Sequence, residues 1–235
     1  MIIEYWSDFA CPFCYIAVTR MKRALKELEI EDESKIIFKA FRLNPNAKKV
    51  PTHTIVESFS RHYYMTMEQA AARVEGICAM ARADGLVFNY ATARNSNTTD
   101  ALRLAKLAQS KGNDFGNNFI EKGYIAYFAD NLVLADHDVL RGIAADAGLD
   151  AAEVDDVLNS DRYLAEVLAE EREAHALGIS AVPFFAINGK YGIPGAIEVR
   201  EMKRILMRAF NEEEEESKVS GMVCGPDGCH PAGRQ

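Results

Sequence analysis

The pattern of apolar and polar residues divides this 235-residue chain into strand-like ends and a helix-like middle. Near the N-terminus, residues 1–9 and 36–43 are short apolar runs, rich in β-branched and aromatic residues, of the kind typical of buried strands. Between them, apolar positions repeat with helical spacing up to about residue 29. The N-terminal part therefore predicts one βαβ unit.

The middle of the chain, from about residue 51 to about residue 150, is rich in alanine and has a helical period with few β-branched runs. Helices are expected between breaks that contain glycine or asparagine, and the last of them ends at Gly178. The predicted helices cover residues 67–84, 97–111, 114–129, 136–147, 151–158 and 161–177. The middle therefore predicts a long, all-helical insertion.

After this insertion, two short apolar runs flank the dipeptide Asn188-Gly189. Asn-Gly between apolar segments is the strongest local signal for a β-hairpin. A final helix is predicted over residues 198–211. The chain thus has the element order βαβ, a helical interruption, and then ββα.

Composition and charge argue against two classes of partner. The formal net charge is −8, whereas a surface that follows nucleic-acid phosphates needs clustered Lys and Arg. No apolar run reaches the roughly 18 to 20 residues of a membrane span. The first residues also lack the basic and apolar regions of a secretion signal. We therefore expect a cytoplasmic protein with no nucleic-acid or membrane partner.

The main chemical candidate is Cys11-Pro12-Phe13-Cys14, at the junction of the first strand and helix. Cys11 is expected at the N-cap and Pro12 at the first helical position, where a missing N–H is harmless. The Cys11 sulfur then faces unpaired backbone N–H groups and the positive end of the helix dipole, which favour the thiolate. Cys14 lies one turn further on, within reach of a disulfide. This arrangement indicates a redox site.

The other three cysteines are harder to interpret. Cys78 shares an apolar helical stripe, which favours a buried, inert thiol. Cys224 and Cys229 flank a Gly-Pro-Asp-Gly turn behind an acidic run. They are either a second dithiol that exchanges with Cys11–Cys14, a metal clip with His230, or incidental thiols of a disordered tail. Within the fold itself no metal site is predicted, because zinc wants four ligands.

Three segments together resemble a known superfamily: residues 7–14, 42–45 and 178–185. They are similar to the DsbA-like thioredoxin-superfamily oxidoreductases. The closest resemblance is to the branch that groups FrnE-type, polyketide-isomerase-like proteins with hydroxychromene-carboxylate isomerases and kappa-class glutathione transferases. The resemblance implies an α/β protein with a thioredoxin fold (βαβ…ββα) that is interrupted by a large all-helical insertion domain.

On this basis the chain divides into three parts. Residues 1–48 and 160–211 form a discontinuous thioredoxin-fold domain, and residues 49–159 form the helical insertion domain. Residues 212–235 are an acidic, Cys-containing tail, in which the run of five glutamates favours a frayed helix end or a linker over packed structure.

The resemblance also implies a set of site residues. Pro183 would be the cis-proline that faces the active-site cysteines, and the backbone of Val182 would pair with a bound peptide or thiol ligand. Phe13 and Trp6 are expected to contact substrate beside them. Leu102 stands where relatives often have a histidine, which weakens an isomerase interpretation.

The function predicted from these observations is cytoplasmic thiol–disulfide exchange. Cys11 attacks a substrate disulfide and Cys14 resolves the mixed disulfide, so disulfide-containing proteins or small thiols are the expected substrates. No cofactor is expected, and glutathione is the candidate thiol co-substrate, with an unknown reductant or oxidant as recycling partner. The alternatives are a glutathione-dependent isomerase or transferase, whose relatives tend to carry serine in place of Cys11, and a redox-regulated binding or sensor protein.

Overall fold

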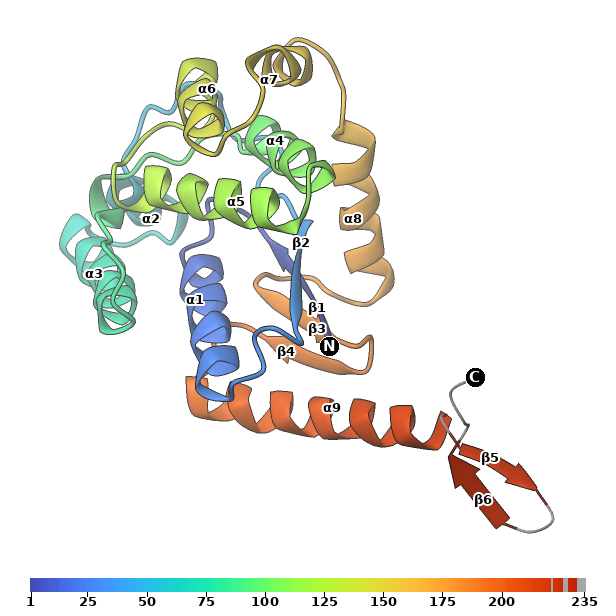
Figure 1. The fold of residues 1–235 in the computed structure, drawn as a ribbon. Helices are drawn as coiled ribbons and strands as arrows, with labels where there is room; N and C mark the ends of the chain where they lie inside the picture. Colours follow the sequence, from blue (N-terminus) through green and yellow to red (C-terminus); the bar gives the residue numbers. More distant parts are fainter. Residues whose placement is uncertain (221, 226–227, 232–235) are drawn as a thin grey trace.

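A mixed four-stranded sheet forms the centre of the fold (Figure 1). The structure is a computed structural model that describes residues 1–213 and 215, together with the backbone of residues 214, 216–220, 222–225 and 228–231. The strands have the order β2-β1-β3-β4; β1 and β2 are parallel, and the other pairs are antiparallel. Their bounds are β1 Ile2–Ser7, β2 Lys35–Ala40, β3 Phe184–Ile187 and β4 Tyr191–Pro194.

Helices cover both faces of this sheet. Helix α1 (Pro12–Glu27) joins β1 to β2, and it packs beside α9 (Val199–Ser220), which follows β4 (Figure 1). On the opposite face, α8 (Leu164–Ala176) packs against the buried ring of Trp6. The expected βαβ and ββα units therefore come together in one sheet.

The chain between β2 and α8 forms only helices, which we call the helical insertion. Its helices are α2 Ile55–His62, α3 Met67–Ala83, α4 Thr99–Ser110, α5 Asn113–Phe128, α6 His137–Asp146 and α7 Ala151–Leu158, with a short 3₁₀ turn at Tyr90–Thr92. The sequence analysis missed α2, although a capping box marks its start. The Thr54 hydroxyl accepts from the Glu57 N–H, and the Glu57 carboxylate accepts from the Thr54 N–H.

The sheet and the helical insertion share one hydrophobic core. Phe9, two residues after β1, packs against Phe119 and Tyr124 of α5, with ring centroids 6.2 and 5.4 Å away. Helix α5 approaches closely because residue 123 is glycine: a Cβ there would lie 2.6 Å from a ring carbon of Phe9. With this continuous core, the exact domain boundaries at 48/49 and 159/160 stay a prediction.

The hairpin expected at Asn188-Gly189 is confirmed. Both residues have positive φ, 50° and 65°, which is the requirement of the turn that suits the twist of paired strands. The strands on either side pair in register, with Ile187 opposite Tyr191. This hairpin forms the edge of the sheet next to β1.

The C-terminal end of the last helix differs from the expectation. Helix α9 continues through the acidic run to Ser220, whereas the sequence predicted an end at residue 211. The first glutamates have partners that offset their mutual repulsion: Glu212 lies 3.4 Å from Arg208, and Glu213 accepts from the Asn188 side chain at 2.9 Å. These contacts extend the helix into a segment for which charge alone left a frayed helix end and a linker both open.

Among the described residues, no helix is both long enough and apolar enough to cross a membrane.

Candidate active site

The local structure around Cys11 and Cys14 follows from the strand-to-helix turn. Cys11 is the N-cap of α1, with an extended backbone, and Pro12 occupies the first helical position as expected. The Cys11 N–H donates to the Asp8 carbonyl at 3.0 Å, and the Cys14 N–H donates to the Cys11 carbonyl at 3.1 Å. Both thiols are free, and Cys14 has no exposed surface. The turn therefore places Cys11 at the N-cap of α1 and the fully buried Cys14 in the first turn of the helix behind it.

The Cys11 thiol faces the loop before β3. Its sulfur donates to the Val182 carbonyl oxygen at 3.6 Å, and the Val182–Pro183 peptide bond is cis, as expected. The sequence analysis had directed this sulfur toward the free N–H groups of α1, but the side chain makes no capping hydrogen bond. The Cys11 thiol donates instead to the Val182 carbonyl, which belongs to the loop before β3.

Cys14 is fully buried, whereas Cys11 lines the cleft. Burial raises the pKa of the Cys14 thiol well above its ordinary value, and the neighbouring Cys11 raises it further. Two hydrogen-bond donors act in the opposite direction: the Ser7 hydroxyl and the Asp8 backbone N–H. The thiolate form of Cys14 thus depends on the few donors that β1 and the following turn provide.

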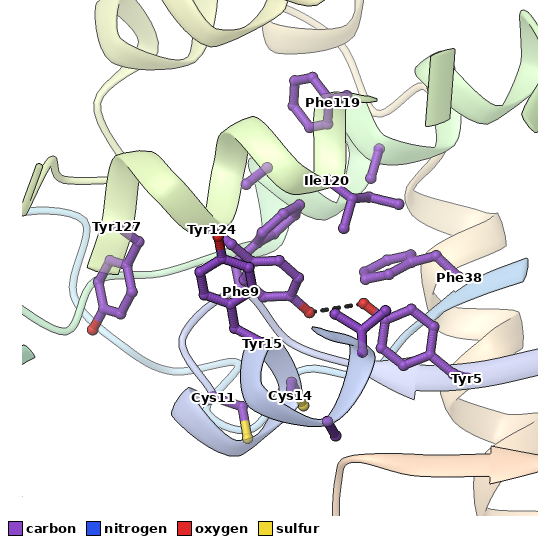
Figure 2. Close-up of a cluster of buried hydrophobic side chains, with 14 of the residues drawn as sticks. Tyr5, Phe9, Cys11, Cys14, Tyr15, Phe38, Phe119, Ile120, Tyr124 and Tyr127 are labelled. Carbon is purple, nitrogen blue, oxygen red and sulfur yellow. Dashed lines mark hydrogen bonds between the residues drawn. The ribbon is translucent and has the colours of Figure 1, made fainter. Parts of the chain in front are cut away.

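Ser7 belongs to a chain of buried hydroxyl groups. Its Oγ lies 2.5 Å from the Tyr124 hydroxyl, which lies 2.9 Å from the Tyr5 hydroxyl. Figure 2 shows the Tyr5 and Tyr124 hydroxyls joined by their hydrogen bond, on the side of α1 where Cys14 lies. The sequence analysis missed these residues. Ser7 stood inside the segment that carried the resemblance, but nothing in the sequence connected it with residue 124.

A cleft of about 760 Å³ opens in front of Cys11, between the start of α1 and the helical insertion. One wall comes from the first turn of α1, the loop after β2 and Val182; the other comes from α2, α3 and the segment before α4. The lining side chains include Cys11, Phe13, Leu43, Phe59, His62, Tyr63, Ser96 and Val182. A substrate that reaches Cys11 therefore contacts both parts of the molecule.

Asp8 is a buried carboxyl at the base of this cleft, which the sequence analysis did not single out. It accepts from the Leu43 N–H at 2.8 Å and from the Ala10 N–H at 3.1 Å, so it ties the loop after β2 to the turn before α1. Burial raises the pKa of Asp8, while these N–H groups and the Thr98 hydroxyl lower it in part. Asp8 therefore holds the loop after β2 against the turn that leads into Cys11.

Two of the three predicted substrate contacts lie in the cleft. Val182 and Phe13 line it, and the Phe13 side chain is partly exposed. The prediction for Trp6 is wrong. Trp6 is fully buried on the opposite face of the sheet, where its indole N–H donates to the Glu170 carbonyl at 3.1 Å. Residues of a strand alternate between faces, and position 6 has the opposite parity to Tyr5 and Ser7.

The C-terminal cysteines lie in a second small sheet, formed by β5 (Met222–Gly225) and β6 (Gly228–Pro231). Its antiparallel register sets the backbone of Cys224 directly opposite that of Cys229. The expected turn at residues 226–227 lies outside the described residues, as do the side chains of the proposed metal clip. Figure 1 shows the hairpin beyond the C-terminal end of α9, away from the first turn of α1. Among the described side chains, no group of three potential metal ligands occurs.

Comparison with known families matches residues 2–207 to the DsbA-like thioredoxin domain. The chain belongs to this family. The match confirms the suspected superfamily and the predicted fold class, a thioredoxin fold with a helical insertion. It ends before the acidic run, so the tail that carries Cys224 and Cys229 lies outside the family model.

Individual proteins match this chain over nearly its whole length. A probable DsbA oxidoreductase from Streptomyces coelicolor is 32% identical, has a TM-score of 0.85 and covers 99% of this chain and 100% of its own. The uncharacterized protein YwbO of Bacillus subtilis is 27% identical over 215 residues, which are 90% of this chain and 96% of YwbO. The family resemblance is therefore not limited to the cysteine motif.

More distant structures share the fold. The cytosolic disulfide reductase DsbM from Pseudomonas aeruginosa is 18% identical, with a TM-score of 0.60, and covers 90% of this chain and 99% of its own. A 2-hydroxychromene-2-carboxylate isomerase is 12% identical, with a TM-score of 0.66, and covers 92% of this chain and 99% of its own. The same architecture thus carries both disulfide chemistry and isomerase chemistry.

Proposed function

We propose that this protein is a cytoplasmic thiol–disulfide oxidoreductase in which Cys11 and Cys14 form the redox-active pair. The observation that carries the proposal is the position of Cys11 on the wall of the cleft, with its sulfur 3.6 Å from the Val182 carbonyl oxygen. Cys14 lies one turn behind it without exposed surface. A first thiol at the cleft and a shielded second thiol support a two-step exchange.

In the reducing direction, the Cys11 thiolate attacks one sulfur of a substrate disulfide. The substrate S–S bond breaks, a Cys11–substrate disulfide forms, and the first substrate thiolate leaves and takes up a proton. Cys14 then loses its proton and attacks the Cys11 sulfur, which releases the second substrate thiol. Two electrons have passed to the substrate, and the Cys11–Cys14 disulfide needs a thiol reductant to be reduced again; the reverse sequence oxidises a dithiol.

The expected substrates are disulfide-containing proteins or small disulfides, with glutathione as the candidate small thiol. DsbM is described as cytosolic and has been solved with GSH, which supports a reduced-thiol environment for this fold. The cleft also suits such ligands, because Val182 supplies backbone groups beside the reactive sulfur. Pro183, held cis next to Val182, shapes this side of the site.

The isomerase or transferase alternative is less well supported by the site. That chemistry relies on the thiol of bound glutathione, whereas this protein has its own thiol on the cleft wall at Cys11, with the second thiol of Cys14 behind it. Leu102, at the position where relatives often carry a histidine, is fully buried in α4 and is not among the residues that line the cleft. The oxidoreductase remains the function that the geometry favours.

The test is reduction of insulin disulfides and oxidative refolding of a reduced protein, with wild type, Cys11→Ser and Cys14→Ser. Cys11→Ser is expected to lose turnover in both assays, and Cys14→Ser to accumulate a mixed disulfide on Cys11. Cys78→Ser is the matched control, because it removes a buried thiol of α3 that does not line the cleft. Full activity of Cys11→Ser would contradict the proposal.

The same assays address the second pair. We expect partial loss of turnover in Cys224→Ser/Cys229→Ser if the tail dithiol exchanges with Cys11–Cys14. Figure 1 shows the hairpin away from the first turn of α1, which follows Cys11, so this exchange requires either movement of the hairpin or a second molecule. A loss that depends on protein concentration would indicate a second molecule, and unchanged turnover would assign no redox role to the tail.

A further inference from the structure

The hydroxyl groups of Tyr5, Tyr124 and Ser7 form a buried chain beside Cys14. In the proposed function the Cys14 sulfur must become charged. Ser7, Tyr124 and Cys14 are completely buried, and Tyr5 is 1% exposed. Their hydroxyls lie in hydrogen-bond contact in the order Tyr5, Tyr124, Ser7. The Ser7 hydroxyl is also the side-chain donor that lowers the pKa of the buried Cys14 thiol. A buried polar group without such partners would be strongly destabilising.

The proposed function requires a charge at this point. When Cys14 attacks the mixed disulfide, its sulfur must be a thiolate, although it has no contact with water. The groups that act on it most strongly are the other cysteine, the Ser7 hydroxyl and the Asp8 backbone N–H, and none of them carries a positive charge. Neutral donors therefore have to stabilise the thiolate.

We propose that Ser7 is a further catalytic residue, which donates a hydrogen bond to the Cys14 thiolate during resolution of the mixed disulfide, and that Tyr124 of the helical insertion positions the Ser7 hydroxyl for this step. The inference rests on the proposed function and assigns it a residue beyond the two cysteines. It also gives the helical insertion a part in the chemistry.

The chain of hydroxyls can serve both protonation states of Cys14 without movement of heavy atoms. Either oxygen of each pair can be the donor, since a hydroxyl rotates to suit its partners. With Cys14 as a thiolate, Tyr5 donates to Tyr124, Tyr124 to Ser7, and Ser7 to the sulfur. A donor that is already in place needs no reorganisation when the charge develops.

Packing holds Tyr124 in the position that this role needs. Its ring stacks on Tyr15 of α1, with centroids 4.8 Å apart and planes 12° apart, and Phe9 packs against it at 5.4 Å. Figure 2 shows Tyr124 descending from α5 toward Tyr5 and the start of α1. Three elements, β1, α1 and α5, thus meet at Tyr124: β1 at its hydroxyl and α1 at its ring.

In the resolution step the atoms and electrons balance without any further reactant. The Cys14 sulfur, with the Ser7 hydrogen bond, attacks the Cys11 sulfur; the Cys11–Cys14 bond forms and the Cys11–substrate bond breaks. The electron pair leaves with the substrate sulfur, which takes up one proton in place of the one that Cys14 released. Ser7 and Tyr124 keep their own protons throughout.

The experiment separates formation of the mixed disulfide from its resolution. Reduced wild type, Ser7→Ala and Tyr124→Phe are mixed with oxidised glutathione and quenched with acid at successive times. Intact-protein mass spectrometry then measures the fraction that carries glutathione. We expect formation at the wild-type rate and resolution about ten- to a hundredfold slower in Ser7→Ala, the range for loss of a hydrogen bond to a charged group. Tyr124→Phe is expected to give a smaller slowing, and Ser7→Thr, which keeps the hydroxyl, to recover part of the rate.

Tyr127→Phe is the matched control. Tyr127 lies on the same helix and is similarly buried, but its hydroxyl has no hydrogen-bond partner among the described residues, so this variant should resolve at the wild-type rate. Equal slowing of Tyr127→Phe and Tyr124→Phe would indicate a packing effect and overturn the positioning role.

A pH profile gives a second readout that packing would not change. The titratable groups facing Cys14 are Cys11 on its own helix, Tyr5 on β1 and Tyr124 on α5, with Glu121 of α5 acting on Tyr5 from further away. Loss of the Ser7 donor should move the rise of the resolution rate to higher pH, by about one unit for a tenfold effect. An unchanged rate and profile in Ser7→Ala would overturn the inference, whereas a wild type that forms no mixed disulfide would contradict the proposed function itself.

Discussion

The two faces of β1 have opposite characters, although they belong to one six-residue strand. Ile3, Tyr5 and Ser7 belong to the face that α1 and α5 cover, which we call the cysteine face. Glu4 and Trp6 belong to the other, which we call the α8 face. Side chains of a strand alternate, so one strand serves both faces. The side chains next to the cysteines and those that hold α8 therefore lie on opposite faces of the same strand.

The cysteine face is aromatic and its polar groups are hydroxyls. Tyr5 stacks on Phe185 with centroids 5.2 Å apart and meets Phe38 edge-on at 5.5 Å. Its polar groups, Tyr5, Tyr124 and Ser7, bond to one another beside Cys14. Burial raises the pKa of both tyrosines, so they stay neutral donors.

The α8 face is held by carboxylates. Glu170 accepts from the Ala40 N–H at 2.6 Å and pairs with Lys106 at 2.7 Å. Glu171 pairs with Arg42 at 2.7 Å, and Glu173 of the same helix reaches Lys39. Next to these pairs, Trp6 lies in a small apolar cluster. Charge on this face fixes a helix, whereas on the cysteine face a charge appears only during reaction.

The largest expected effect is on the α8 face. Trp6→Ala removes the biggest fully buried side chain and its hydrogen bond to Glu170, which should lower the free energy of unfolding by about 3 to 5 kcal/mol. Turnover per folded molecule should be unchanged, because Trp6 does not line the cleft. The free energy of unfolding is measured by urea unfolding with circular dichroism, because Trp6 is the only tryptophan and its loss removes the tryptophan fluorescence signal. Insulin reduction measures the turnover.

Phe13→Ala is the complementary variant on the cleft. Phe13 is 37% exposed, so its loss should change stability by less than about 1 kcal/mol while it raises the KM for a protein substrate. A fall in turnover per folded molecule for Trp6→Ala, or none of these changes for Phe13→Ala, would break the separation of the two faces.

A smaller effect is expected from the ion pairs of α8. The Glu171 carboxylate accepts from the Arg42 backbone N–H and from two guanidinium nitrogens, at 2.9, 2.7 and 2.9 Å. Glu171→Gln should therefore lower the free energy of unfolding by about 1 to 3 kcal/mol, and less so at high salt. The control is Glu201→Gln, which breaks an exposed pair with Arg204 and should leave the free energy of unfolding nearly unchanged, because solvent screens such a pair. Equal losses in both variants would show that α8 is not held by these pairs.

The smallest effect is a pH dependence at the cleft end of β1. Burial raises the pKa of Asp8 above 3.8, so its contribution to stability is complete below about pH 4 and is lost as the pH rises through the folded-state pKa. Asp8→Asn lacks this dependence. The difference in unfolding free energy, wild type minus variant, should therefore fall as the pH rises from about 4, as measured by urea unfolding across pH.

Asp100→Asn gives the opposite sign and serves as the control. Burial raises the pKa of Asp100, but hydrogen bonds from His137, Lys49 and Arg103 outweigh it and lower the pKa below 3.8. Its contribution to stability is present above about pH 4 and is lost as the pH falls through the folded-state pKa. The wild-type-minus-variant difference should then rise with pH, and the same slope in both variants would contradict the assignment at Asp8.

Much of the fold could be predicted because its signals are local. The N-cap at Cys11, the helical period of the insertion and the Asn188-Gly189 turn each depend on a few neighbouring residues. The capping box at Thr54 was just as local, but α2 spans only eight residues and was not predicted from the helical period. The continuation of α9 depended on partners such as Asn188, which is distant in the sequence.

The sequence by itself determined the placement of Cys11 and Cys14 at a strand-to-helix junction, the thioredoxin order of elements and the Asn188-Gly189 turn, since spacing and turn chemistry act over a few residues. Only the tertiary structure decided which way each side chain points: Cys11 toward Val182, Trp6 toward α8, and Ser7 toward a tyrosine more than a hundred positions later. The physical reason is that side chains alternate along β1, so the pattern alone does not say which of the two alternating sets faces α5 and which faces α8. Packing of α5 and α8 on opposite sides settles it.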